Sequence, residues 1–354
     1  MRRGLMKWRE DELSTDAIAA RVANLRAALI GRGLDAFLCY TTLVRPAAVH
    51  FLTGFTPYWS DGLLMVGRDD SRPVFVTALS KRVGKWLHGV NPTCEIMHAP
   101  RPGLKIGEIL AQRGIRRLAV LELDMMPGAL VEDLKAADDV ELIPGDDLFA
   151  AIRARPASSE IRLARRAQAI AQNAFEQLSL RLQTVGDVVG PLERSVRGQG
   201  AEECYIAVAP DLESASGLAR HHHATPLAER FAARISVAYN GVWSRFTRTM
   251  RKGVPYSEEA SAHLGDIVSS LDISRAVSGQ LAALLEGTPV SIDFWSLEGP
   301  VGTRPLAQVA TKDRPVEAAI PYGVLTLAGY DPGGRFLFSG LVIPGTAREA
   351  LEAA

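Results

Sequence analysis

Residues 234–249 have the sequence RISVAYNGVWSRFTRT, in which two β-rich runs flank Asn240-Gly241. Asn-Gly between alternating apolar residues is the strongest short-range signal for a β-hairpin with a two-residue type I′ turn. Such a turn fixes which residues face each other across the ladder. The predicted opposed pairs are Arg234 with Thr247 and Ser236 with Arg245.

The two faces of this hairpin differ in chemistry. Side chains alternate between faces along a strand, so each face collects every second residue. One face is largely apolar, and the other carries two arginines. The apolar face is predicted to hold Ile235, Val237, Tyr239, Val242 and Phe246, and the other face Arg234, Ser236, Arg245 and Thr247.

The sequence before the hairpin is typical of an α/β domain. Between residues 15 and 150, helical and strand periods of apolar residues alternate, which predicts a mixed sheet flanked by helices. The expected helices are 16–29, 106–112 and 129–136. The expected strands are 36–40, 49–53, 63–66, 74–77, 118–121 and 140–143, with a hairpin turn at 68–71.

The pattern breaks at residues 154–159, which we interpret as a domain boundary. We therefore predict a first domain of residues 1–153 and a second of residues 154–354. The second is expected to open with a helix over 160–182 and to contain another helix over 257–271. Its expected strands are 206–209, 234–239, 242–249, 290–295, 323–327 and 336–343.

Composition excludes several functional classes. The 354 residues include 40 Lys+Arg and 40 Asp+Glu, so no net charge attracts the chain to nucleic acid or to an acidic membrane surface. No apolar run reaches the roughly 18–20 residues of a membrane-spanning helix, and residues 1–16 lack a secretory signal. Cys39, Cys94 and Cys204 are too far apart for a zinc or disulfide framework. These features predict a cytoplasmic protein.

Several segments together resemble one family. They are VANLRAALIGRGLDAFLCY at 22–40, VHFLTGF at 49–55, residues 149–175, the Tyr239-Asn240-Gly241 and Thr247-Arg248-Thr249 triplets, and GVLTL at 323–327. In this order they resemble the creatinase/aminopeptidase P group of the M24 "pita-bread" family, over residues 18–345. The resemblance implies an α/β (α+β) fold, with a creatinase-type N-terminal domain followed by a pita-bread domain, and an assembly of two subunits.

The resemblance also implies a metal site, whose ligands this sequence lacks. Metalloenzymes of the family bind two divalent ions through two Asp, one His and two Glu. The alignment puts other residues at all five positions, namely Arg234, Arg245, Gly299, Ala328 and Ser339. No Asp occurs between Asp211 and Asp266, and no His follows His263. We therefore expect no metal in the usual place and no other cofactor.

If the arginine-bearing face still lines the family's cavity, it should hold an anion. Arginine keeps its proton, so two guanidinium groups on one face need a carboxylate between them. We predict that Arg234 and Arg245 hold either Glu298 or a carboxylate of the substrate. The alternatives are a solvated face or a salt bridge that replaces the lost ions. Tyr239 and Arg248 are further substrate-binding candidates, and Glu298 is also a catalytic one.

Two loops supply the remaining candidates. In the family a histidine before the hairpin contacts the substrate, and in creatinase it acts as general acid/base, so His222 or His223 is the matching candidate. Both could instead be exposed loop residues, and no carboxylate or Cys shares a zinc-binding spacing with them. Trp59, in GFTPYWSDG at 54–62, could close over a ligand or pack beneath its own loop.

Three functions follow from the resemblance. The first is a metal-independent hydrolase or lyase of the creatinase type that cleaves a C–N or related bond of a small anionic substrate. The second is an inactive pseudoenzyme that binds a ligand or a partner, as a homodimer or as a heterodimer with a homologue. The third is a metal-dependent Xaa-Pro aminopeptidase or dipeptidase.

Overall fold

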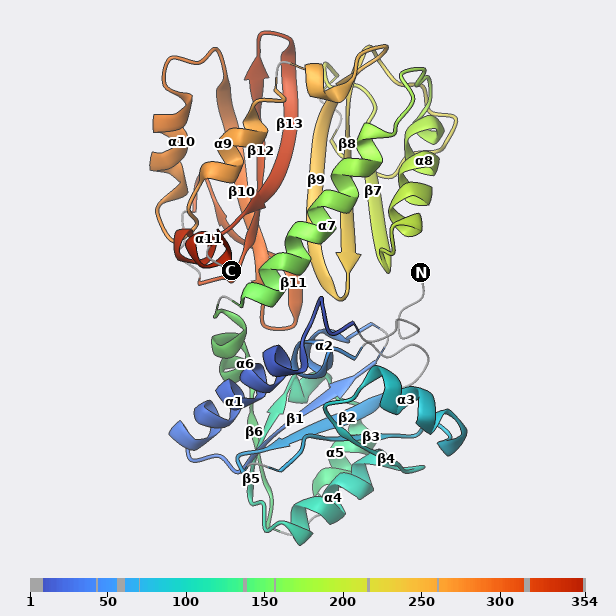
Figure 1. Ribbon diagram of the computed structural model, residues 1–354, viewed down its shortest axis with the longest axis vertical. Helices are drawn as coiled ribbons and strands as arrows, with labels where there is room; N and C mark the ends of the chain where they lie inside the picture. The colour runs from blue at the N-terminus through green and yellow to red at the C-terminus, as the bar shows by residue number, and fades with distance from the viewer. Residues whose placement is uncertain are drawn as a thin grey trace. The chain divides into compact units, whose positions relative to one another are not determined.

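The computed structural model divides the chain into two compact units (Figure 1). It describes residues 9–42, 44–55, 61–69, 71–135, 139–155, 157–214, 217–259, 261–314 and 319–352. The first unit comprises residues 2–154, and the second comprises residues 155–301 and 305–354. No helix among the described residues is long and apolar enough to cross a membrane.

The first unit is a six-stranded mixed sheet with helices on both faces. Its strands are β1 (Ala36–Thr41), β2 (Gly62–Gly67), β3 (Val74–Thr77), β4 (Glu95–His98), β5 (Arg117–Leu121) and β6 (Glu141–Pro144), in the order β4-β3-β2-β1-β5-β6. Its helices are α1 (Thr15–Gly31), α2 (Ala47–Thr53), α3 (Gly84–Val90), α4 (Pro102–Gln112), α5 (Gly128–Lys135) and α6 (Asp146–Arg153). Two separate buried clusters, one per face of the sheet, form its core.

The predicted α/β pattern is confirmed in this unit, although α3, β4 and α6 were not predicted and one predicted strand is wrong. Residues 49–53 form part of α2 and not a strand. The helix ends at Gly54, which adopts φ 72° and donates its N–H to the His50 carbonyl at 2.7 Å. Six of its seven residues are buried. The segment therefore lacks the exposed polar face that identifies an amphipathic helix in a sequence. A short segment buried on all sides cannot be assigned to helix or strand from periodicity.

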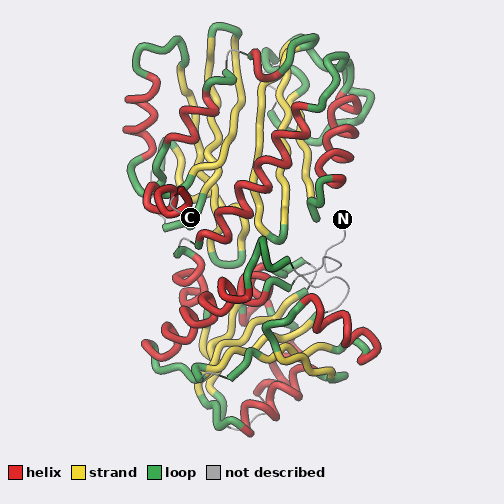
Figure 2. Tube along the Cα trace, viewed as in Figure 1, coloured by secondary structure: helices red, strands yellow, loops and turns green. Residues whose placement is uncertain are grey.

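The second unit is a seven-stranded sheet with helices packed on one face (Figures 1 and 2). Its strands are β7 (Glu203–Ala209), β8 (Arg230–Tyr239), β9 (Val242–Arg251), β10 (Ser291–Val301), β11 (Arg304–Thr311), β12 (Gly323–Asp331) and β13 (Gly334–Val342), in the order β11-β10-β12-β13-β9-β8-β7. Its helices are α7 (Ser158–Glu176), α8 (Val185–Gly198), α9 (Leu264–Ser270), α10 (Val277–Leu285) and α11 (Gly345–Glu352). Two buried clusters lie between these helices and the sheet, and we call this side the helix face.

Several elements of the second unit differ from the sequence predictions. The helix expected over 160–182 ends at Glu176, and residues 257–271 form a short 3₁₀ turn followed by α9. Between the two, buried Glu259 pairs with Arg230 and Arg251. Helix α8 was not predicted, since it contains three glycines and Pro191. Its start is nevertheless marked by a Thr184/Asp187 capping box.

Candidate functional site

The predicted hairpin is the centre of the candidate site. Asn240 and Gly241 have φ values of 46° and 73°, as a type I′ turn requires. The observed ladder pairs Arg234 with Thr247 and Ser236 with Arg245, which confirms the predicted register. The predicted apolar residues all belong to the core beneath α7 and α8. The two arginines therefore lie on the opposite side of the sheet from the helices.

A polar row crosses this opposite side of the sheet. The strand registers align five residues from five strands, namely Ser296, Thr326, Ser339, Thr247 and Arg234. Ser339 donates a hydrogen bond from Oγ to Thr247 Oγ1 at 2.8 Å, and both side chains are fully buried. We use the name arginine face for the surface made by Arg234, Ser236, Arg245, Thr247 and Glu298.

Arg245 and Glu298 form an ion pair on the arginine face. Arg245 Nη1 pairs with Glu298 Oε2, and Arg245 Nε donates to Ser236 Oγ at 3.1 Å. Each side chain of the pair is 17% exposed. Because β13 and β12 separate β9 from β10 in the sheet, the two side chains meet above those strands. Glu298 is therefore the anion that Arg245 holds in this structure, one of the two options predicted.

Arg234 lacks such a partner. Within the described part of the chain, its guanidinium makes no hydrogen bond or ion pair. Partial burial lowers the pKa of Arg234, and the positive charge of Arg245 lowers it further, while Glu298 acts in the opposite direction. Of the three charged side chains on the arginine face, two are cations and one is an anion. The face has a net positive charge, and Arg234 is the cation that makes no ion pair with a described residue.

Aromatic side chains border the arginine face at its β7 edge. Tyr205 lies opposite Ser236 in the β7–β8 ladder, and its ring stacks on Trp243 with centroids 5.6 Å apart. The guanidinium carbon of Arg220 lies 5.7 Å from the Tyr205 ring. This group was not predicted from the sequence, because the strand was expected to begin at residue 206 and not at Glu203. Strand alternation, which groups Trp243 with Arg245, was the available signal.

Comparison with known proteins agrees with this architecture. The creatinase/prolidase N-terminal domain family matches residues 21–155. The match spans most of the first unit. No curated protein matches the chain in sequence.

Solved structures match both units together. A Xaa-Pro dipeptidase from Bacillus anthracis has a TM-score of 0.67 at 22% identity, covering 92% of this chain and 95% of that one. An X-Pro aminopeptidase from Thermotoga maritima gives 0.64 at 17% identity, with 91% and 94% covered. A prolidase from Pyrococcus furiosus gives 0.61 at 15% identity, with 91% and 95% covered. The chain has the pita-bread fold of the M24 creatinase/aminopeptidase P group.

The donors on the arginine face do not fit the two divalent ions that metalloenzymes with the pita-bread fold bind. Such ions need several converging oxygen or imidazole ligands, with carboxylates to balance the charge. Arg234 and Arg245 offer hydrogen-bond donors and no acceptor. Ser339, aligned with a glutamate position, donates its hydroxyl to Thr247. Among the described residues, no three His, Cys, Asp or Glu side chains converge on a common point.

The candidate histidines lie beside α8, and His221 and His223 share a cavity with Tyr205 and Arg220 of the aromatic group at the β7 edge. His223 accepts a hydrogen bond on its carbonyl from Gly186 N at 2.9 Å, and His222 Nδ1 accepts one from Ala224 N at 3.2 Å. Both residues are exposed. His221 and His223 line a cavity of about 390 Å³. Val185, Cys204, Ile206 and Val208 line it too, and all four pack in the helix-face core.

The structure also separates the other predicted residues from the arginine face. Tyr239 belongs to the helix-face core, where the guanidinium carbon of Arg166 lies 5.7 Å from its ring. Arg248 points to the helix face as well, because it alternates with Thr247 along β9. Trp59 lies outside the described residues. Of the predicted site residues, the structure thus brings together Arg234, Arg245 and Glu298.

Proposed function

We propose that this protein uses the pita-bread scaffold to bind a small carboxylate on the arginine face, without the two-metal hydrolysis of M24 metalloenzymes. The observation that carries the proposal is Arg234, a partly buried cation that makes no hydrogen bond or ion pair with a described residue, beside the Arg245–Glu298 pair. A guanidinium matches a carboxylate with two parallel hydrogen bonds, which are among the strongest in proteins. This is the ligand-binding alternative among the functions considered.

The position of the acid/base candidates favours binding over hydrolysis. A general base must reach the proton that it removes, directly or through one water. His222 and His223 are exposed beside α8, and in the described structure neither makes a hydrogen bond with Arg234, Arg245 or Glu298. Glu298 already pairs with Arg245, so its carboxylate is engaged by a cation of the protein itself.

Small peptides are suitable first ligands. The structural relatives include a Xaa-Pro dipeptidase, and a dipeptide ends in a free carboxylate. Tyr205 and Trp243 offer ring surface beside the cationic groups, against which an apolar side chain or a proline ring could pack. We therefore propose Ala-Pro and succinate as probes, with Ala-Pro amide as the matched compound without a terminal carboxylate.

Replacing Arg234 with Gln tests the binding proposal. A hydrogen bond to a charged group contributes about 1.5–3 kcal/mol, so Arg234→Gln should weaken Ala-Pro binding at least about tenfold in isothermal titration calorimetry. Arg162→Gln, at an exposed position of α7, should leave the affinity unchanged. Equal affinity for Ala-Pro and its amide, or no effect of Arg234→Gln, would refute the carboxylate site.

Metal content and turnover test the second half of the proposal. We expect purified protein incubated with Mn²⁺, Co²⁺ or Zn²⁺ and then desalted to retain far less than one ion per chain by elemental analysis. We also expect intact Ala-Pro after incubation, as followed by NMR. Near-stoichiometric metal would contradict the expected loss of the metal site, and release of free proline would show that the protein is a hydrolase.

A further inference from the structure

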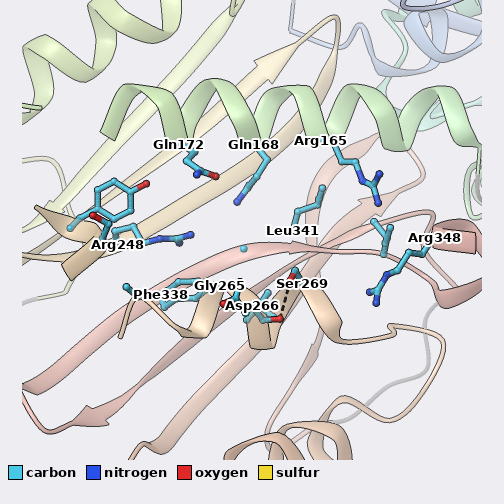
Figure 3. A pocket seen from close by; sticks show the side chains of 16 residues that line it. Arg165, Gln168, Gln172, Arg248, Gly265, Asp266, Ser269, Phe338, Leu341 and Arg348 are labelled. Carbon is cyan, nitrogen blue, oxygen red and sulfur yellow. Dashed lines mark hydrogen bonds between the residues drawn. The ribbon is translucent and has the colours of Figure 1, made fainter. Parts of the chain in front are cut away.

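The helix face of the second unit contains a second polar cavity, of about 510 Å³, between α7, α9 and β13 (Figure 3). Its lining includes Arg165, Gln168 and Gln172 from α7, Arg248 from β9, and Arg348 from α11. The cavity lies on the opposite side of the sheet from Arg234 and Arg245. It is therefore independent of the site proposed above.

Arg248 is fixed in this cavity with part of its guanidinium unused. Its guanidinium carbon lies 3.6 Å from the Phe246 ring centroid and 3.9 Å from that of Phe338. Nη1 donates to the Thr247 and Ser339 carbonyls at 2.8 and 2.7 Å. Nε and Nη2 make no hydrogen bond with any described residue. The rings and carbonyls therefore hold Arg248 in place, while Nε and Nη2 remain available to a ligand.

Among the residues that the structure describes, no carboxylate forms an ion pair with Arg248. Burial lowers the pKa of this guanidinium to about 9, which reflects a cation that its surroundings solvate poorly. The nearby phenol of Tyr256 has a pKa raised to about 12, so it is neutral at neutral pH. Tyr256 donates to Glu176 Oε1 at 3.3 Å, and that residue is exposed on α7. In the described structure, Glu176 forms no ion pair with Arg248.

Two more arginines lie at the other end of the cavity (Figure 3). Arg165 is exposed and makes no hydrogen bond or ion pair with a described residue. Arg348 donates to the Ser270 and Leu271 carbonyls at 3.3 and 2.9 Å. Asp266 is the acidic residue in the lining, and it is exposed. The cavity lining thus carries three cations, Arg165, Arg248 and Arg348, and one anion, Asp266.

The spacing along α7 sets the length of a ligand that could reach both ends. Gln172 lies near Arg248 in Figure 3, and Arg165 is two turns earlier on the same helix, or about 10 Å away at 1.5 Å per residue. Gln168 lies between them and directs its side-chain amide into the cavity (Figure 3). Its Oε1 accepts a hydrogen bond from Ser244 Oγ at 2.8 Å, which leaves its Nε2 as a donor.

We propose that this cavity binds an extended small-molecule dicarboxylate. One carboxylate lies on the unused Nε and Nη2 of Arg248, and the other lies between Arg165 and Arg348. Two carboxylates at the ends of a chain of five or six carbons, each with a hydrogen bond to its arginine, suit the rise of about 10 Å between Gln172 and Arg165 along α7. Glutarate and adipate are therefore the probes, and hexanoate is the matched monocarboxylate.

Arg165→Gln is the decisive variant, because Arg165 is exposed and its loss should not affect folding. We expect it to weaken adipate binding at least tenfold in calorimetry, with little change for hexanoate, which needs only Arg248. The neighbouring Arg162→Gln should bind adipate as the unchanged protein does. Unchanged adipate affinity in Arg165→Gln would overturn the proposal.

Arg234→Gln separates this site from the arginine face. We expect adipate binding that depends on Arg165 to persist in Arg234→Gln, whatever happens to Ala-Pro binding in that variant. If adipate binding is instead lost in Arg234→Gln and kept in Arg165→Gln, the dicarboxylate occupies the arginine face, and the second cavity has no such role.

Discussion

Replacing Asp331 with Asn should lower the free energy of unfolding of the second unit by about 3–5 kcal/mol. Asp331 has a fully buried side chain, and both of its carboxylate oxygens accept from Arg230 Nη2 at 2.9 Å. Arg230 is itself 7% exposed, so the substitution leaves a buried cation short of negative charge. The pair joins the start of β8 to the end of β12, which are not neighbours in the sheet.

Arg230 has limited means of compensating for this loss. Its other carboxylate partner, Glu259, lies at 3.4 Å and is shared with Arg251. Its Nε and Nη1 atoms are buried without a hydrogen-bond partner. Asp331 also accepts the N–H of Gly333 at 2.8 Å, a bond that an Asn side-chain oxygen can keep. The expected loss therefore arises from the charge and not from the turn.

Urea denaturation measures the change in the free energy of unfolding. Hydrogen exchange of peptides from β8 and β12 shows whether the transition belongs to the second unit. The matched control is Glu193→Gln, which removes the exposed Glu193–Arg197 pair of α8. An exposed pair contributes about 0–1 kcal/mol, so this variant should unfold close to the unchanged protein. A loss below about 1 kcal/mol for Asp331→Asn would mean that the buried network contributes little net stability.

The turn, the register and the strand faces of the candidate site could be predicted from the sequence, because each depends on residues that are close together in the chain. Asn240-Gly241 fixed the register, and strand alternation placed Arg234 and Arg245 on one face. The Arg245–Glu298 pair was predicted as one of two options. The sequence has no local signal that brings residues 53 positions apart together across two intervening strands.

The errors have physical causes too. The segment 49–53 is buried on all sides, so its apolar pattern lacks a helical period. The role of the histidines was inferred from position along the chain, whereas the loop that carries them pairs with the edge of β7 through Ala219 and Val208. That edge pairing directs His223 toward α8. Arg248 was grouped with the site by its motif, although strand alternation puts it on the helix face.

Glu298→Gln should change stability and anion affinity in opposite directions. Glutamine has nearly the same shape but no charge, so Arg245 loses its counterion and remains partly buried. An unsatisfied buried partner of this kind costs about 1–3 kcal/mol of unfolding free energy. Removing the carboxylate also leaves Arg234 and Arg245 both free to bind an external anion.

The gain in affinity should be large. A unit charge about 5 Å away contributes about 3 kcal/mol at an effective dielectric constant of about 20, so carboxylate binding should tighten on the order of a hundredfold at low salt. Added salt should reduce the gain, because the pair is partly exposed and therefore screened. Calorimetry with succinate in low and high salt, and urea denaturation of the same variant, measure the two effects.

The sign of the affinity change distinguishes the possible roles of Glu298. If Glu298 is a competing internal anion, Glu298→Gln binds succinate more tightly, and the variant Arg245→Gln binds it more weakly than the unchanged protein. If Glu298 is instead a catalytic base, the same substitution leaves succinate affinity near its original value and abolishes turnover of the true substrate. Weaker succinate binding in Glu298→Gln would contradict both roles, because it would mean that the carboxylate organises the face and does not compete for it.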